Sequence, residues 1–514
     1  MPPRSCGTSS CRALQRKGGS PVMHIASISP ELTPFASTGE LGRHVRSLTE
    51  ALGALGQRVS VFVPFYRSAR DGGIDAPEVA SGTTLVGAEI VPWRLRRAQP
   101  SPQNVDFFLV ENQGYFDREG LYGDARGDYH DNCSRFLFLC RAALEAAETL
   151  GDPVDLFHAH DWEAGLVPAY LRCSFSERPF FRRAASVFTV HQIGYLGQFW
   201  HWDWPLLNLP WKHFNWREME FHGKICFLKA GLVYADTLTT VSPGYAKEIQ
   251  QPDGGSGLEG LLRERAADLE GIVAGIDTQD WDPALDGKLA ERFSAADPAA
   301  KSRNRGPLFQ RCEWDDDRGR PIAALLGPLT ERAGVVLVAQ ALDELVRREM
   351  RLVIVGTGDE RCKTLFQRLR NLHPQRLSVF WTQNDELMRL AMAGSDILLR
   401  PGLDSPSDAT HLCALRYGAI PIARRTGILA DTLVDGTPET LAEGTATAFL
   451  FDEPTSRGLL DAIDRALAVR RDRPDVWRSV QVSAMRQDWS WGRCARAYIE
   501  IFEKAREKAV ARAR

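Results

Sequence analysis

Tryptophan is concentrated in one stretch of the chain, residues 199–216, which reads FWHWDWPLLNLPWKHFNW and holds five of the thirteen tryptophans. Flat aromatic rings flanked by polar groups stack on the apolar C–H faces of sugars. The stretch therefore favours a carbohydrate-binding surface, although the packing of a long loop is the alternative. The rings expected to bind are those of Trp200, Trp202, Trp204 and Trp211.

Histidine and aspartate follow two buried apolar runs. His160 and Asp161 come shortly after the run 154–158, and His191 ends the run 186–191. Polar side chains at the carboxyl ends of parallel strands lie where such folds bind ligands, so these three residues are candidate catalytic residues. A satisfied structural pair is the alternative for His160 and Asp161. A histidine that only fixes its own loop is the alternative for His191.

Two series of strands and helices must position these residues. Short apolar runs alternate with amphipathic segments from Met23 onward, which predicts parallel sheets covered by helices on both faces. The first series has expected strands at 22–28, 59–64, 154–158, 186–191 and 238–241, with helices at 41–55, 132–150 and 225–235. The second has strands at 322–326, 352–355, 377–381, 397–399 and 420–423. The sequence thus predicts two doubly wound α/β domains facing a ligand-binding cleft.

Composition restricts the possible partners. The net charge of the 514 residues is −3, which gives no overall field to attract nucleic acid or an acidic membrane. No apolar run approaches the ~20 residues that a membrane helix needs. The ten cysteines include no Cys-x-x-Cys pair, which argues against a disulfide framework or a metal site and for a cytoplasmic protein. Residues 1–22 lack any hydrophobic period and are expected to be a disordered, dispensable extension.

Several long motifs resemble the glycogen and starch synthase family. In the first half these are PELTPFASTGELGRHV (30–45), YFDREGLYGD (115–124), DNCSRF (131–136), HAHDWEAGLVPAYL (158–171), VFTVHQIGYLGQF (187–199), GKICFLKAGLVYADTLTTVSPGYAKEI (223–249) and GIVAGIDTQDWDP (271–283). In the second half they are GPLTERAG (327–334), ALRYGAIPIARRTGILADT (414–432) and DWSW (488–491). The resemblance runs from about Met23 to Ala505.

This resemblance implies the GT-B fold and transfer of glucose from ADP-glucose, or sometimes UDP-glucose, to the non-reducing end of an α-1,4-glucan. It implies no metal and no cofactor, and it places His191 beside the reacting sugar and the tryptophan stretch on the acceptor side. The expected domains are an acceptor-side domain at 23–281, a connection at 282–320, a nucleotide-sugar-type domain at 321–487 and a C-terminal helix at 488–514.

The resemblance also implies a donor-binding set, from which this chain departs. The family's loop lysine is Ser37, its second loop glycine is Glu40, and the cations that open its second domain are Pro328 and Ala333. Its sugar-binding glutamate is Ser405, and a glycine that approaches phosphate is Asp408. Gly39, Thr410, Thr426 and Gly427 remain at the other donor positions.

These departures leave two functions open. The diphosphate leaving group needs cations and N–H donors, and the acids at 40 and 408 add negative charge instead. Nucleotide-sugar binding is therefore expected to be weak or absent, whereas glucan binding is expected to persist. The chain is interpreted either as a glucosyltransferase or as an inactive glucan-binding paralogue. Arg332 is a poor substitute for the missing lysine, whereas Arg424 and Arg425 are better candidates for residual phosphate binding.

Overall fold

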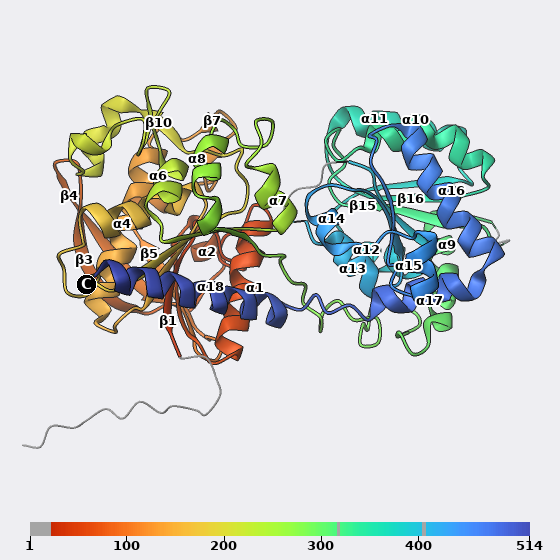
Figure 1. Cartoon of the computed structure of the whole chain (residues 1–514), viewed down its shortest axis with the longest axis horizontal. Coiled ribbons are helices and arrows are strands. Elements are labelled where there is room, and N and C mark those ends of the chain that lie inside the picture. The colour runs from red at the N-terminus through yellow and green to blue at the C-terminus, as the bar shows by residue number, and fades with distance from the viewer. Residues whose placement is uncertain (1–21, 316–318, 403–407, 514) are drawn as a thin grey trace, which may run out of the picture.

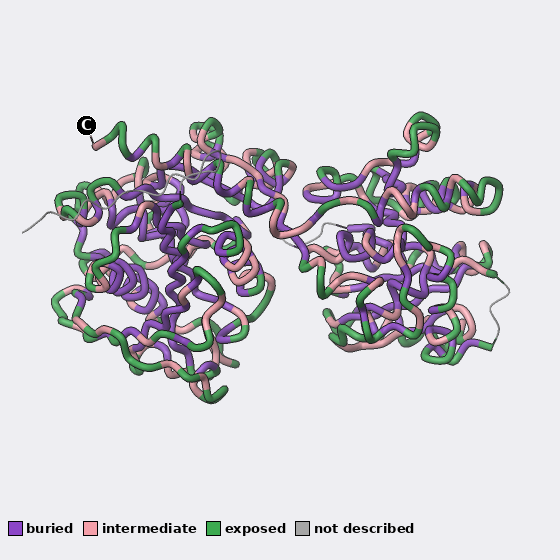
Figure 2. Tube along the Cα trace, turned by 90° about the horizontal axis from the view of Figure 1, so that it is seen from below, coloured by how far each residue is buried: buried purple, intermediate pink, exposed green. Residues whose placement is uncertain are grey.

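Two sheets, each covered by helices, divide the chain into two domains (Figure 1). The structure is a computed structural model that describes residues 22–315, 319–402 and 408–513. Residues 1–21 of the expected extension, and Ser405, lie outside the described residues. Buried residues form separate cores in the two domains, and only narrow connections join them (Figure 2).

The first sheet has nine strands, and most of its pairs are parallel. One edge differs from the sequence prediction, because β4 pairs antiparallel with both β5 and β3. Strand β3 alternates exposed and buried residues, a half-buried pattern that lacks the continuous apolar runs of the central strands. In spatial order the strands are β14 (Leu269–Gly271), β13 (Thr237–Thr240), β9 (Ala185–Val190), β8 (Leu156–His160), β1 (His24–Ile28), β2 (Arg58–Pro64), β5 (Val105–Glu111), β4 (Glu89–Arg97) and β3 (Glu78–Val86).

Helices cover both faces of this sheet because successive strand residues point in opposite directions. Ile25 and Val61 pack against α1 (Glu40–Ala54) and α18 (Trp491–Arg512) on one face. Ala26 and Phe62 pack on the other face, which is covered by α4 (Asn132–Leu150), α5 (Leu166–Cys173) and α6 (Phe227–Tyr234). No helix within the described ranges is long and apolar enough to cross a membrane.

The second sheet is wholly parallel. Its order is β17 (Leu377–Trp381), β16 (Arg351–Gly356), β15 (Ile322–Leu326), β18 (Ile397–Arg400), β19 (Ile420–Arg424) and β20 (Phe449–Phe451). This is the Rossmann order, 3-2-1-4-5-6, so the predicted two-domain doubly wound fold is confirmed. The helices around it include α10 (Val335–Arg347), α11 (Glu360–Leu372), α12 (Asp385–Gly394), α13 (Thr410–Arg416), α14 (Gly427–Thr432), α16 (Ser456–Asp472) and α17 (Pro474–Met485).

Segment 282–320, expected as a connection, packs into the second domain. Its helix α9 (Arg305–Cys312) contributes Leu308 and Phe309 to the second core. Asp280 and Trp281, which directly precede this segment, contact the buried Arg389 of the second domain. Its guanidinium donates to an Asp280 carboxylate oxygen at 2.6 Å and lies 4.0 Å over the Trp281 ring. The many charged residues of this segment concealed its few buried apolar ones from the sequence pattern.

The C-terminal helix α18 returns to the first domain after the chain has completed the second (Figure 1). The chain passes between the domains twice, and the two connections touch where the Ile276 N–H donates to the Trp489 carbonyl at 2.8 Å. On α18, Tyr498 and Phe502 are fully buried and pack against His158 of the first sheet. The helix therefore anchors the chain, after it leaves the second domain, in the core of the first domain.

Phe502→Ala is expected to destabilise the first domain by about 3–5 kcal/mol, because it removes a buried ring and leaves a cavity. Urea unfolding measures the loss. Glu500→Ala, on the exposed side of the same helix, is the matched control and is expected to change stability by less than about 0.5 kcal/mol. Equal stability of the two variants would show that α18 is not part of the core.

Candidate functional site

The second sheet's order defines where a ligand binds. The order reverses between β15 and β18, and ligands of such sheets bind outside the carboxyl ends of the strands at this switch point. Gly327 follows β15 there with a φ of 106°, a backbone conformation that favours glycine. A Cβ on Gly327 would lie 3.5 Å from Arg400 Nη1 and 3.7 Å from Asp408 Oδ2, so these side chains fill the space beside the turn.

A buried ion pair occupies this switch point. Arg400, the last residue of β18, donates from Nη2 to Asp408 Oδ2 at 2.7 Å and from Nη1 to the Leu326 carbonyl at 3.0 Å. The other oxygen of Asp408 accepts the Thr410 N–H at 2.7 Å, at the start of α13. Burial alone would raise the pKa of Asp408, but Arg400 and the Thr410 hydrogen bonds lower it to about 2. An ionised carboxylate thus holds donors that also suit a phosphate oxygen.

The two acids expected to repel a diphosphate both lie in ion pairs. Asp408 is neutralised by Arg400, and Glu40 forms an ion pair with Arg43 on α1. Burial raises the pKa of Glu40, and Arg43 lowers it by a smaller amount. The negative charges of Asp408 and Asp385 raise the Glu40 pKa further. The structure therefore brings Glu40 and Asp408 within electrostatic reach of each other across the cleft, each with its own cation.

The other opening-loop positions carry no cation. Gly39 precedes α1 without a side-chain cap, and a Cβ there would meet nothing within 4 Å. Ser37 Oγ donates to the Gly39 carbonyl at 3.0 Å. The loop is fixed instead by the buried Glu31 carboxylate, which accepts the Thr38 N–H at 2.8 Å and the Tyr122 hydroxyl at 2.7 Å.

Arg332 is an exposed cation shortly after the first strand of the second domain. Pro328 is exposed and Ala333 half-buried, and neither carries charge. Burial raises the pKa of Tyr245, on α7 (Pro243–Glu248) of the first domain, to about 12, and the Arg332 charge opposes that rise. Within residues 22–315, 319–402 and 408–513, no carboxylate lies within ion-pairing distance of the exposed Arg332. The Arg332 charge is therefore felt at Tyr245 of the first domain.

The two proposed phosphate-binding arginines of β19 and its loop are already engaged. Arg425 donates to Asp435 at 3.0 Å and to Asp452 at 3.1 Å. Arg424 Nε lies 3.4 Å from the Asp452 carbonyl. These contacts favour a structural role for the pair.

Two carboxylates also connect the domains directly, between helices α7 and α14, which face each other (Figure 1). Glu248 Oε1 of α7 accepts the Gly427 N–H at 2.7 Å, at the start of α14. In return Asp431 Oδ2 of α14 accepts the Gly244 N–H at 2.6 Å. Gly427, whose φ is 43°, follows Thr426, which makes no side-chain cap. The N–H at a second expected donor position thus binds a carboxylate of the facing domain.

The first domain contributes a row of buried histidines. His160 Nδ1 shares a 3.1 Å hydrogen bond with His191 Nε2, and Ser27 Oγ lies 3.1 Å from His160 Nε2. The His44 ring packs edge-on against His191 with centroids 4.6 Å apart. Burial lowers the pKa of each of these histidines and of His158, so all are neutral at pH 7. His160 is fully engaged, whereas His191 Nδ1 has no hydrogen-bond partner in the described structure.

Asp161 has the properties of an acid–base group. Its φ of 55° and ψ of −176° lie in a region that glycine favours, so its backbone is strained at the carboxyl end of β8. Its Oδ1 accepts the His191 N–H at 2.7 Å. Burial raises its pKa to about 7 against hydrogen bonds from His191 and Gln192, so the carboxyl can hold or release a proton near neutral pH.

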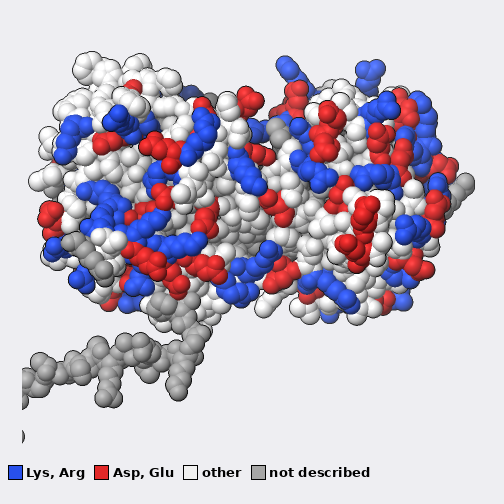
Figure 3. Space-filling view, in the orientation of Figure 1, with Lys and Arg blue, Asp and Glu red and all other residues white. Residues whose placement is uncertain are grey.

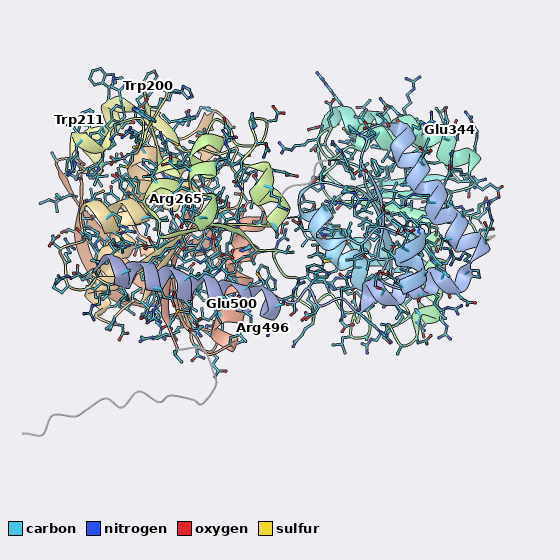
Figure 4. The ribbon with its side chains drawn as sticks, viewed as in Figure 1. Trp200, Trp211, Arg265, Glu344, Arg496 and Glu500 are labelled. Atoms are coloured by element: carbon cyan, nitrogen blue, oxygen red, sulfur yellow. The ribbon has the colours of Figure 1, made fainter. Side chains whose placement is uncertain are left out.

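The tryptophan stretch lies apart from these groups. Trp200 and Trp211 stand along the upper edge of the first domain, away from the second domain (Figure 4). Trp200, Trp202 and Trp211 are exposed. Trp204 is fully buried against Trp211 and Phe214, so its predicted contact with a glucan is wrong. Sequence reasoning could not separate it from its neighbours because all four rings share one polar-looking segment.

Comparisons with known proteins identify the lineage. Residues 24–264 match the starch synthase catalytic domain, and residues 320–468 match the glycosyl transferases group 1. A glycogen synthase of Koribacter versatilis is 38% identical over 94% of this chain and 99% of its own length. A glycogen synthase of Anaeromyxobacter is 38% identical over 93% of this chain and 99% of its own. The chain belongs to the glycogen synthase family.

A solved structure of a family relative supports the same assignment. The catalytic domain of starch synthase IV from Arabidopsis thaliana, bound to ADP and acarbose, matches with a TM-score of 0.82 at 25% identity. The match covers 95% of this chain and all of that one. Sucrose-phosphate synthase from Thermosynechococcus elongatus, at 15% identity and a TM-score of 0.55, shares the fold alone. The predicted GT-B architecture is therefore confirmed.

Several functional groups were missed by sequence reasoning. Arg400, Tyr245, Glu248 and Asp431 carry the contacts just described, and none was singled out. Arg400 left one signal, because it is a charged residue at the end of the buried strand 397–400. Charges inside buried strands are rare without a partner, so this position is a signal from which a buried ion pair can be inferred.

Stability is expected to fall steeply as the pH drops from 7 to 5. The buried histidines have pKa values below the ~6.5 of the unfolded chain, about 4 for His44, so only the unfolded state takes up protons in this window. Below pH ~6.5 the loss from each approaches about 1.4 kcal/mol per pH unit. Asp161 and Glu163, whose pKa values burial raises, each oppose one histidine's contribution. Urea midpoints measured across this range test the slope.

His44→Phe is expected to reduce that slope by one histidine's share, because neither ring nitrogen of His44 has a hydrogen-bond partner in the described chain. The exposed His130→Phe is the control and should leave the slope unchanged. Identical slopes for all three proteins would contradict the assignment of neutral buried histidines.

Proposed function

We propose that this chain is a glycogen synthase-family protein that binds α-glucan and no longer transfers glucose from a nucleotide sugar. One observation carries the proposal: the Asp408 carboxylate, held by Arg400 and the Thr410 N–H, fills the switch point of the nucleotide-sugar-type domain. A diphosphate would have to displace a buried, ionised group that belongs to the protein itself.

Electrostatics support the loss of transfer. The departing nucleoside diphosphate needs cations and N–H groups aimed at its charge, and removing one such donor costs about 3–4 kcal/mol of transition-state stabilisation. By resemblance, the family's cations are replaced at Ser37, Pro328 and Ala333, and its sugar-binding glutamate at Ser405. Such losses are not additive, but together they leave the leaving group without most of its expected support.

One set of contacts favours a second candidate function. Asp161 and His191 keep an acid–base group and an available ring nitrogen at the end of the first sheet, and Arg332 presents a cation from the facing domain. These three groups could serve glucosyl transfer from ADP-glucose, UDP-glucose or a different donor through a rebuilt site. Activity that depends on His191 would decide for this alternative.

The glucan half of the proposal rests on the family and on the exposed aromatic rings. The relatives named glycogen synthase act on a polymer of glucose, and the first domain keeps exposed tryptophans that can stack on sugar rings. We place the protein in the cytoplasm, because the eight described cysteines are all free and seven are buried.

The assay for transfer is direct. With glycogen primer and ADP-glucose or UDP-glucose, glucose incorporation is expected to equal that of a no-enzyme control, because the leaving group is unsupported. A glycogen synthase relative assayed in parallel verifies the reagents. Incorporation by this chain that disappears in His191→Ala would overturn the proposal and establish the rebuilt site.

A further inference from the structure

A pocket opens at the amino ends of the central strands of the first sheet. It has a volume of about 250 Å³, and its lining comes from strands β1 to β5, the end of α4 and the loop that follows α4. The carboxyl ends of β8 and β9, two parallel strands of the same sheet, carry His160 and His191. The pocket therefore lies at the opposite end of the sheet from the cleft, and we call it the basal pocket.

Apolar side chains form one part of the lining. Phe62 and Phe108 stack with their ring centroids 5.3 Å apart. Ala147, Leu150 and Val154 line the pocket with them. This part of the lining suits the hydrocarbon portion of a small ligand, because apolar surface gains free energy when it leaves water.

The polar lining includes a hydroxyl group whose direction of donation is fixed by its neighbours. His24 Nδ1 lies 2.9 Å from the Pro153 carbonyl, which can only accept, so this nitrogen carries the ring proton. Burial lowers the pKa of His24, so the ring is neutral at pH 7. Its Nε2 therefore accepts a hydrogen bond from Ser60 Oγ at 2.9 Å. The Ser60 oxygen keeps its lone pairs for a donor inside the pocket.

The end of α4 adds to this preference for a donor. Ala147 and Leu150 belong to the last turn of this 19-residue helix, which ends at Gly151. The C-terminus of a helix carries the negative end of its dipole and favours a cation. Together with Ser60 Oγ, it suits an ammonium group.

Two ion pairs complete the lining. Arg58, at the start of β2, pairs with Asp152, and Arg97, at the end of β4, pairs with Asp106 of β5. The two arginine side chains are 48% and 45% exposed, so both pairs are weak surface contacts that a charged ligand can rearrange. Basic and acidic side chains are likewise interspersed over the lower part of the first domain, where β1 begins (Figure 1, Figure 3). A ligand with one charge of each sign leaves this balance intact, whereas a singly charged ligand does not.

We propose that the basal pocket binds a small zwitterion with a hydrocarbon side chain, that is, an apolar α-amino acid. Its ammonium group donates to Ser60 Oγ, its carboxylate accepts from Arg58 and Arg97, and its side chain packs against Phe62 and Phe108. Arg58 and Ser60 are two residues apart on β2 and point to the same face of the sheet, so one α-amino acid can reach both. The pocket is smaller than the ~300–1,000 Å³ of sites for drug-sized molecules, which restricts the ligand to about this size. This site does not depend on whether the cleft transfers glucose.

Calorimetric titration of the full chain with leucine and phenylalanine tests the site. Two analogues of leucine separate the contacts, because leucinamide lacks the carboxylate and isocaproate lacks the ammonium group. Each analogue is expected to bind at least about tenfold more weakly than leucine, since each loses a charged hydrogen-bonded contact. At about ten times its dissociation constant, leucine is expected to raise the melting temperature of the chain by about 2 °C.

Variants of the lining place the ligand. Arg58→Gln/Arg97→Gln removes both cations at exposed positions and is expected to weaken leucine binding by about tenfold. Ser60→Ala removes the acceptor for the ammonium group and is expected to weaken binding in the same direction. Arg347→Gln, at an exposed ion pair of α10 in the second domain, is the matched control and should bind leucine as the wild type does.

The outcomes separate this inference from the proposed function. Wild-type protein that shows no saturable binding of either amino acid would overturn the site. Leucine binding that is unchanged in both lining variants would place the ligand elsewhere and equally overturn it. Leucinamide or isocaproate that binds as tightly as leucine would reduce the ligand to a simple amine or acid and contradict the zwitterion. None of these results bears on glucose transfer or on glucan binding, which decide the proposed function.

Discussion

The buried ion pair between Arg400 and Asp408 is the contact on which the rest of this chain's cleft depends. The Asp408 carboxylate accepts hydrogen bonds from the guanidinium at the end of β18 and from the Thr410 N–H at the start of α13. The two side chains of the pair also fill the space beside Gly327. Breaking a buried pair by removing one partner is strongly destabilising, because the other charge then lacks compensation. A ligand that competes for Arg400 must therefore also accommodate the displaced carboxylate. The same pair explains how a buried acid is accommodated at position 408.

The interdomain contacts extend this arrangement across the cleft. Glu248 supplies a carboxylate to the Gly427 N–H, and Asp431 returns one to the Gly244 N–H. Two backbone donors of the second domain, at Thr410 and Gly427, are thus occupied by the protein's own acids. In a nucleotide-dependent enzyme, anionic ligands commonly bind such donors and hold the domains together. Here the carboxylates of Glu248 and Asp431 join the two domains.

The sequence predicted the two sheets, most of their strands and the family, because continuous apolar runs and long motifs carry that information locally. It could not predict that Arg400 compensates the charge of Asp408, since Arg400 is defined by the strand end and not by any motif. Trp204 could not be told from Trp202 because burial depends on what packs over the loop. The antiparallel β3 and β4 were missed because one face of each is solvated, which weakens the apolar signal. The positions of Arg332 and Glu248 depend on the facing domain, which no local pattern encodes.

The affinity for ADP, measured by calorimetry on the wild type, Asp408→Gly and Asp408→Asn, tests the central claim most directly. If the Asp408 carboxylate fills the switch point, the glycine variant removes the carboxylate that competes with a phosphate for Arg400 and the Thr410 N–H, and it binds ADP at least tenfold more tightly than the wild type, a gain of at least about 1.4 kcal/mol. The asparagine variant removes the charge but keeps the volume, and it gains less. Thermal unfolding of each variant verifies that it is folded. Tight ADP binding by the wild type, unchanged in Asp408→Gly, would contradict the account.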